Sequence, residues 1–132
     1  MKEFKIELPK SLRFLKPFGF HDYNKLQMEA RCVISDSGTI AEESSMLGFP
    51  AVTIRNALER PEALDTGAII ITGLKARTIS LGVKEAIRGY SDGIIADVPA
   101  DYKITNTSQR VVRLILGTAG LNARWHGLDR IT

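Results

Sequence analysis

The chain has 132 residues, of which 44% are hydrophobic and 25% are charged, the composition of one soluble globular domain. Its single cysteine, Cys32, excludes an intramolecular disulfide framework and a multi-cysteine zinc site. The formal net charge of +3 comes from lysines and arginines scattered along the chain, which argues against a nucleic-acid-binding face.

The amino terminus does not have the pattern of a targeting segment. The first ten residues, MKEFKIELPK, alternate charged and apolar side chains and lack the apolar stretch of a secretory signal. The sequence contains no run of about 18 apolar residues that would span a membrane. We therefore expect a cytoplasmic protein that binds neither membranes nor nucleic acid and holds no metal or cofactor.

Short apolar runs alternate with longer segments of mixed character along the chain. The runs predicted as strands are residues 12–15, 32–34, 51–54 and 68–72. The segments predicted as helices are residues 21–30, 39–47, 78–90 and 107–116. Alternation of this kind favours right-handed βαβ units in an α/β fold, with a Rossmann-like, doubly wound parallel sheet whose strands are buried on both faces.

The last part of the chain differs from the rest. Residues 90–103 form the loosest segment, and residues 104–132 are predicted as a terminal helical tail whose first helix begins at the N-cap residue Asn106 or Thr107. The apolar residues of this tail recur at helical spacing: Val111, Leu114, Ile115, Leu121, Trp125 and Leu128. Two interpretations stay open, in which this apolar face packs on the sheet of its own domain or docks onto another domain or chain.

The segment from Ser35 to Gly38 follows a predicted strand and directly precedes a predicted helix. In an open α/β sheet, ligands bind at the carboxyl ends of the strands, and the first amides of a helix attract anions. Gly38 permits close approach, and Ser37 adds a hydroxyl donor. The pattern predicts a phosphate site, although an ordinary helix start has the same composition.

Two adjacent carboxylates in this helix are distinguished by helical geometry. If Ile40, Ser44 and Leu47 form the packed side, Glu43 flanks that side and Glu42 points toward solvent. Glu42 also has capping-box spacing from Thr39, whereas Glu43 lies where ribose hydroxyls would need an acceptor. The alternative for Glu43 is a surface ion pair.

Arg55 and Arg60 follow the next predicted strand and should overhang the same edge of the sheet. Guanidinium groups bind diphosphates and carboxylates through paired hydrogen bonds. The alternative is a solvated loop in which Glu59 and Arg60 contribute little.

Three blocks together resemble one enzyme family: SDSGTIAEESSMLG at residues 35–48, ERPE at residues 59–62, and KPFGFHDYNKLQMEA at residues 16–30. They look like the carboxyl-terminal half of the non-hydrolysing UDP-N-acetylglucosamine 2-epimerases. The resemblance covers residues 13–74 closely. The later NTSQRVVRLIL and NARWH are similar to a subgroup that serves capsule and O-antigen sugar synthesis.

The resemblance implies a single Rossmann-like UDP-binding domain over residues 1–132, one half of a GT-B architecture. Position by position, it places Ser37, Gly38 and Thr39 at the diphosphate. It places Glu43 at the ribose hydroxyls and Tyr23 near the uracil. It places Arg60 near the phosphates and the sugar, where it is the catalytic candidate of this half. The family often has a second glycine where this chain has Thr39, and Tyr23 often aligns with phenylalanine.

The reaction implied by the resemblance inverts carbon 2 of UDP-N-acetylglucosamine, or of a 6-deoxy relative, by elimination and re-addition of UDP. The acid and base groups of the family lie in the amino-terminal domain, so we expect this chain alone to be inactive. His21 and His126 are expected to have structural roles. The expected partners are a UDP-sugar, an amino-terminal domain or a complementing chain, and a second copy in a homodimer. The alternatives are the donor-binding half of a GT-B glycosyltransferase and a non-catalytic nucleotide-binding module.

Overall fold

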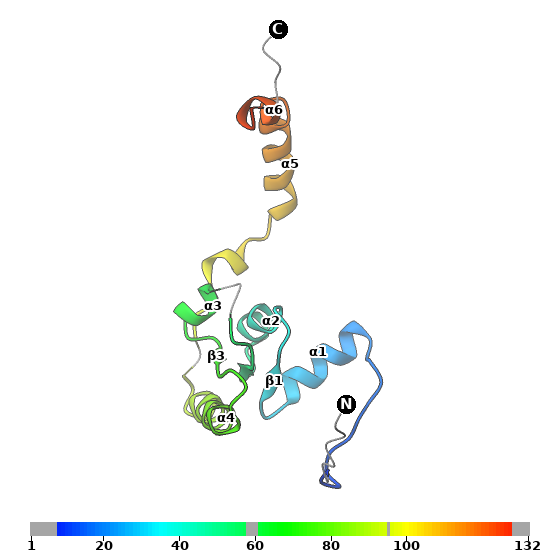
Figure 1. Cartoon of the computed structure of the whole chain (residues 1–132), viewed down its shortest axis with the longest axis vertical. Coiled ribbons are helices and arrows are strands. Elements are labelled where there is room, and N and C mark those ends of the chain that lie inside the picture. The colour runs from blue at the N-terminus through cyan, green and yellow to red at the C-terminus, as the bar shows by residue number, and fades with distance from the viewer. Residues whose placement is uncertain (1–7, 58–60, 95, 128–132) are drawn as a thin grey trace.

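The computed structural model describes residues 8–57, 61–94 and 96–127 (Figure 1). The strands are β1 (Val33–Ser35), β2 (Ala51–Thr53) and β3 (Ile70–Ile71). The helices are α1 (Phe20–Glu29), α2 (Ile40–Leu47), α3 (Glu62–Asp65), α4 (Ala76–Ser91), α5 (Thr107–Thr118) and α6 (Asn122–Trp125), with a short 3-10 helix, η1, at Ala100–Lys103. Of the elements predicted from periodicity, all four helices and the last three strands are present at closely similar bounds.

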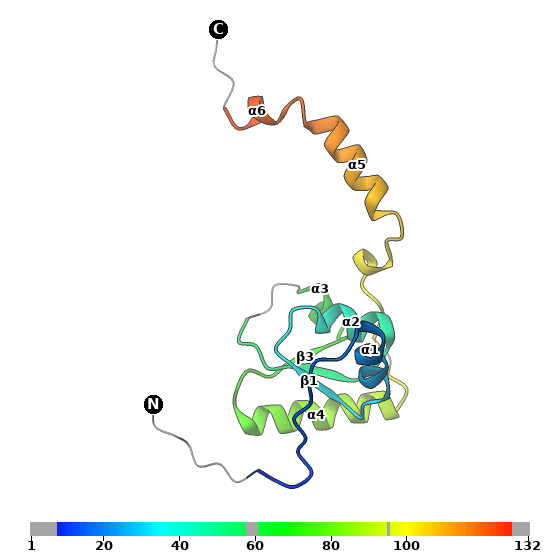
Figure 2. The ribbon, with the colours of Figure 1, turned by 90° about the vertical axis from the view of Figure 1, so that its right-hand side faces the viewer.

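The three strands form one parallel sheet in the order β1-β2-β3. The register aligns their carboxyl ends, because Ser35 pairs with Thr53 and Thr53 pairs with Ile71. Helix α2 lies on one face of the sheet and α4 on the other (Figure 2). The prediction of a doubly wound parallel α/β sheet is therefore confirmed.

The core lies around the central strand β2, whose three residues are all buried. Ile40 of α2, Phe49, Ala63 of α3 and Ile69 form the apolar cluster beside it. On the other face, α4 approaches the sheet closely at Gly82, which is the one buried residue of that helix. The sheet is therefore held between two helical layers over β2 and β3.

The expectations for the amino-terminal part of the sheet are partly wrong. Residues 12–15 form no strand, and Phe14 is 82% exposed. Strand β1 is not buried on both faces either, because Ile34 is 52% exposed. The two differences have separate causes. Residues 12–15 pair with no described strand, and a short apolar run becomes a strand only where a neighbouring strand accepts its hydrogen bonds. Ile34 lies on the edge strand β1, beyond the strands β2 and β3 against which α4 packs.

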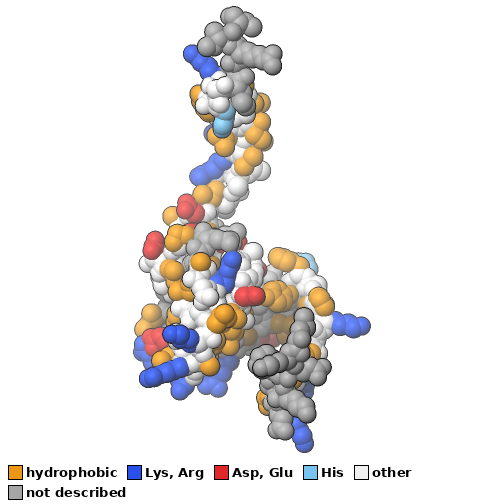
Figure 3. Space-filling view, in the orientation of Figure 1, with side chains coloured by type: hydrophobic (Ala, Val, Ile, Leu, Met, Phe, Trp, Pro, Cys, Tyr) orange, Lys and Arg blue, Asp and Glu red, His pale blue; other side chains and the backbone are white. Residues whose placement is uncertain are grey.

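The carboxyl-terminal helices extend away from the sheet (Figures 1 and 2). The space-filling view shows hydrophobic side chains along α5 (Figure 3), and Leu114 and Trp125 are 62% and 63% exposed. The interpretation in which this apolar face packs on its own sheet is therefore wrong. Asn106 is the N-cap residue of α5, but its side chain accepts a hydrogen bond from Arg110 Nε instead of capping the helix.

Cys32 lies half-buried just before β1, and burial raises the pKa of its thiol above the usual value. Only the thiolate is nucleophilic, so a raised pKa leaves less reactive thiolate at a given pH in the folded chain than in the unfolded chain. We expect iodoacetamide at pH 8.5 to alkylate Cys32 several-fold more slowly in buffer than in denaturant. Equal rates, after correction for the denaturant's effect on a cysteine peptide, would contradict this expectation.

Candidate functional site

Three loops meet at the carboxyl edge of the sheet. They follow β1, β2 and β3 at residues 36–39, 54–57 and 72–75, and the register of the parallel strands brings their starting points side by side. Ligands of open α/β sheets bind at this edge. The loops after β2 and β3 approach each other, since a Cβ placed on Gly73 would lie 3.1 Å from Asn56 Oδ1.

The first loop is organised by the hydroxyl of Ser37. Its Oγ accepts a hydrogen bond from the Thr39 amide over 3.3 Å and lies 2.9 Å from Thr39 Oγ1. The Ser37 amide in turn donates to Ser35 Oγ over 3.0 Å. Ser37, Gly38 and Thr39, three of the predicted diphosphate ligands, are therefore held together in one turn that leads directly into α2.

The predicted capping box between Thr39 and Glu42 is not formed. Thr39 already has helical backbone angles, φ −77° and ψ −13°, and its side chain makes no capping hydrogen bond. A capping side chain needs an extended N-cap residue, and here Ser37 supplies a hydroxyl acceptor from two residues earlier. The positive end of the α2 dipole faces this loop, which favours an anion there.

Glu43 lies one turn into α2 and is half-buried. Its Oε2 accepts a hydrogen bond of 2.7 Å from Nε2 of Gln27 on α1, so Glu43 is not part of a surface ion pair. Of the three residues expected on the packed side of α2, Ile40 and Ser44 are buried, but Leu47 is exposed. Ala41 and Ser45 are buried in addition. The helix turns its small residues toward the sheet, which allows it to lie close to β2.

Gln27 is the residue of this site that the sequence analysis missed. Its side chain is only 3% exposed, which is unusual for glutamine. The signal available in the sequence was its spacing, since it lies four residues after Tyr23 and so shares a face of α1 with it. A polar residue at that spacing from a predicted ligand is itself a candidate for the site.

Tyr23 lies in the first turn of α1. Helix α1 extends outward from the neighbourhood of β1 (Figure 1), and Gln27 in its second half is hydrogen-bonded to Glu43 of α2. The residue is 41% exposed, and an exposed aromatic ring can stack on a planar ligand. Tyr23 thus lies one turn before Gln27, the residue that joins α1 to α2, and its place beside the uracil stays a prediction.

Of the two arginines predicted at this edge, the structure describes only Arg55. Arg55 is half-buried in the loop after β2, at the predicted edge. Arg60 and Glu59 lie outside the described residues. The ERPE block continues into α3 with Glu62, whose Oε1 accepts a hydrogen bond of 2.8 Å from the Tyr102 hydroxyl of η1. Glu62 thus ties this block to the segment that leads into the tail.

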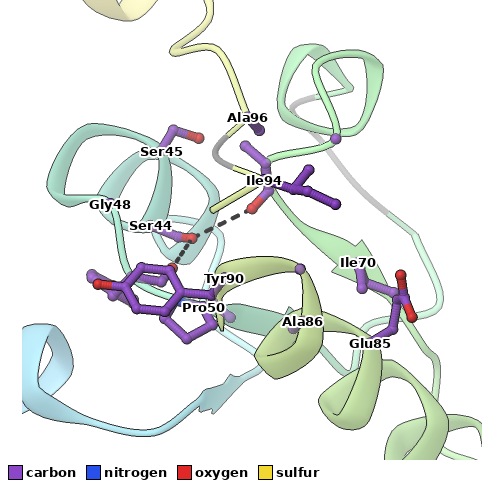
Figure 4. Close-up of a pocket in the computed structure, with 15 residues that line it drawn as sticks. Ser44, Ser45, Gly48, Pro50, Ile70, Glu85, Ala86, Tyr90, Ile94 and Ala96 are labelled. Atoms are coloured by element: carbon purple, nitrogen blue, oxygen red, sulfur yellow. Dashed lines mark hydrogen bonds between the residues drawn. The ribbon is translucent and has the colours of Figure 1, made fainter. Parts of the chain in front are cut away.

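A pocket of about 190 Å³ lies at the opposite, amino-terminal edge of the sheet (Figure 4). Pro50, Tyr90 and Ile94 contribute to its walls, and the Ser44 hydroxyl beside it bonds the carbonyls of Phe49 and Ala68. The carboxyl-terminal ends of α2 and α4 line it. Helix carboxyl termini carry partial negative charge, so this pocket disfavours a phosphate group and is not the anion site.

The remaining candidates for chemistry have local structural contacts. The His21 ring makes an edge contact with Phe20, and His126 Nδ1 lies 2.9 Å from the Asn122 carbonyl. Among the described residues, no three side chains of His, Cys, Asp or Glu gather where they would hold a metal ion. Within the same ranges, none of the helices has the length and hydropathy needed to cross a bilayer.

Comparison with known proteins gives a consistent result. The family model described as UDP-N-acetylglucosamine 2-epimerase matches residues 2–116. The UDP-N-acetylglucosamine 2-epimerase of Methanocaldococcus jannaschii is 34% identical over 55% of this chain and 21% of that protein. The enzyme of the same name from Neisseria meningitidis is 28% identical over 80% of this chain and 29% of that protein.

A solved structure agrees with these sequence matches. The structure of UDP-N-acetylglucosamine 2-epimerase from Rickettsia bellii superposes with a TM-score of 0.73 and is 42% identical, over 84% of this chain and 31% of that structure. The chain thus spans between about a fifth and a third of the length of the relatives it matches.

Proposed function

Since this chain belongs to the UDP-N-acetylglucosamine 2-epimerase family, we propose that it is the UDP-binding part of an epimerase that acts on UDP-N-acetylglucosamine or a 6-deoxy relative. The observation that carries the proposal is the Ser37 loop, which presents a hydroxyl and the amino-terminal end of α2 at the carboxyl edge of the sheet. That arrangement suits a diphosphate.

The other residues predicted to bind the nucleotide have complementary roles in the proposal. Glu43 accepts hydrogen bonds from the ribose hydroxyls, Tyr23 stacks beside the uracil, and Arg60 neutralises the diphosphate. In the reaction, the bond between sugar carbon 1 and the diphosphate oxygen breaks as a base removes the proton from carbon 2. The departing UDP then re-adds to carbon 1 while a proton reaches carbon 2 from the opposite face.

Holding UDP is part of this catalysis. The diphosphate gains negative charge as its bond to the sugar breaks, so the α2 amides and Arg60 stabilise the transition state as well as the bound nucleotide. The base and acid belong to the remainder of a two-lobed GT-B enzyme. The exposed apolar face of α5 and Trp125 is proposed to dock onto that lobe, supplied by a longer polypeptide or a complementing chain.

Calorimetric titration of the 132-residue chain with UDP tests the proposal. We expect saturable binding of UDP and weaker binding of UMP, because UMP lacks the second phosphate. We also expect no epimerisation of UDP-N-acetylglucosamine by the chain alone. Absence of saturable binding would refute the nucleotide-binding role, and epimerisation at an ordinary enzyme rate would refute the assignment of the acid and base to another lobe.

A further inference from the structure

Gln27 is a polar side chain at a buried position of α1, and its carboxamide faces Glu43 of α2. Its exposed fraction is 3%, and its Nε2 donates to Glu43 Oε2 over 2.7 Å. A carboxylate only accepts hydrogen bonds, so the carboxamide must present its nitrogen to Glu43. The two residues are sixteen positions apart in the sequence, and their contact joins α1 to α2.

The other end of the same carboxamide is unsatisfied. Gln27 Oε1 is buried and accepts no hydrogen bond from any residue that the structure describes. Buried polar atoms normally have partners, and an unpaired one destabilises the fold. Methionine would fill a similar volume without leaving an acceptor unpaired. The favourable contribution of Gln27 therefore lies in its nitrogen, which holds the Glu43 carboxylate.

Glu43 needs such a partner if it is to recognise a ligand. A glutamate side chain has several rotatable bonds, and ordering it during binding lowers affinity. The hydrogen bond to Oε2 orders the carboxylate in advance, and it leaves Oε1 to accept from another donor. Glu43 lies four residues after Thr39, one turn further along α2 and on the same face of the helix as Thr39.

We propose that Gln27 is a positioning residue, which holds Glu43 in the rotamer that accepts hydrogen bonds from the ribose hydroxyls of a uridine nucleotide. This inference rests on the proposed function, which assigns the ribose to Glu43. Gln27 is too deeply buried to touch the nucleotide, and it acts only through the carboxylate. It therefore contributes to the recognition of ribose and not of the diphosphate.

The experiment compares UDP with 2′-deoxyuridine diphosphate on the full chain. The test variant is Gln27→Met, which keeps the volume and removes the donor, and the matched control is Lys25→Met, on the exposed side of the same helix. We expect Gln27→Met to bind UDP about tenfold more weakly, with a much smaller loss for the deoxy nucleotide. The preference for UDP should shrink in Gln27→Met and persist in Lys25→Met.

A merely structural role for Gln27 predicts a different result. Loosening of α1 would lower the affinity for both nucleotides by the same factor, and an unchanged preference for UDP in folded Gln27→Met would overturn the inference. Absence of UDP binding by the wild-type chain would instead refute the proposed function. The two failures are therefore distinguishable.

A second measurement needs no folded variant. The side-chain amide protons of Gln27 in the wild-type chain are expected to resonate downfield by NMR because they donate to a carboxylate. UDP should shift these resonances more than 2′-deoxyuridine diphosphate does, since ribose hydroxyls that donate to Oε1 withdraw charge from the carboxylate to which Gln27 also donates. Resonances at random-coil positions, or equal shifts by both nucleotides, would contradict the positioning role.

Discussion

The variant Glu43→Gln is expected to bind UDP about ten to a hundred times more weakly than the wild-type chain, at an unchanged melting temperature. The loss follows from the charge, because a hydrogen bond to a carboxylate contributes about 1.5–3 kcal/mol and each 1.4 kcal/mol is about tenfold in affinity. The fold should be unaffected, since the new amide oxygen still accepts a hydrogen bond from Gln27 Nε2. Calorimetry measures the affinity, and circular dichroism measures the melting temperature.

The matched control for this prediction is Glu42→Gln, in the same first turn of α2. It removes the same charge at nearly the same distance from the helix terminus, so any general effect of charge on an anionic ligand is common to both variants. We expect Glu42→Gln not to weaken UDP binding. If the two variants weaken it equally, Glu43 has no specific contact with the nucleotide and its assignment to the ribose is wrong.

The variant Gly82→Leu is expected to destabilise the chain by about 3 kcal/mol. A Cβ at this position would lie 2.6 Å from Thr72 Cγ2, and 3.5 and 3.6 Å from methyl groups of Ile70 and Val52. Thr72 cannot turn aside freely, because it is buried and its hydroxyl donates to the Thr53 carbonyl over 3.2 Å. A leucine would therefore force α4 away from the sheet.

Gly89→Ala in the same helix is the control, because a Cβ at Gly89 meets nothing within 4 Å. At that position the substitution changes only the helix propensity. Replacing glycine by alanine there should stabilise the chain by up to about 1 kcal/mol. Urea unfolding of both variants gives the two free energies. A Gly82→Leu variant as stable as the wild type would show that α4 does not pack against β2 and β3 as described.

The site was partly predictable because most of its residues are close in sequence. Ser37, Gly38 and Thr39 are consecutive, so a strand ending at Ser35 and a helix beginning at Ile40 already place them in one turn at the sheet edge. The contact of Gln27 with Glu43 was not predictable in this way. It depends on which faces of α1 and α2 are turned toward each other. The periodicity of apolar residues within one helix gives no information on that orientation.

By itself the sequence determined the order and type of the central elements, because the period of apolar residues and the flanking Gly and Pro residues are local properties. Only the tertiary structure decided which apolar residues are covered. Ile34 has a strand pattern and lies on an edge strand, Leu47 has a core spacing and is exposed, and α5 has an apolar face that its own sheet does not cover. A pattern shows that a side chain can be buried, whereas burial requires a second surface to pack against it, and that surface comes from elsewhere in the fold.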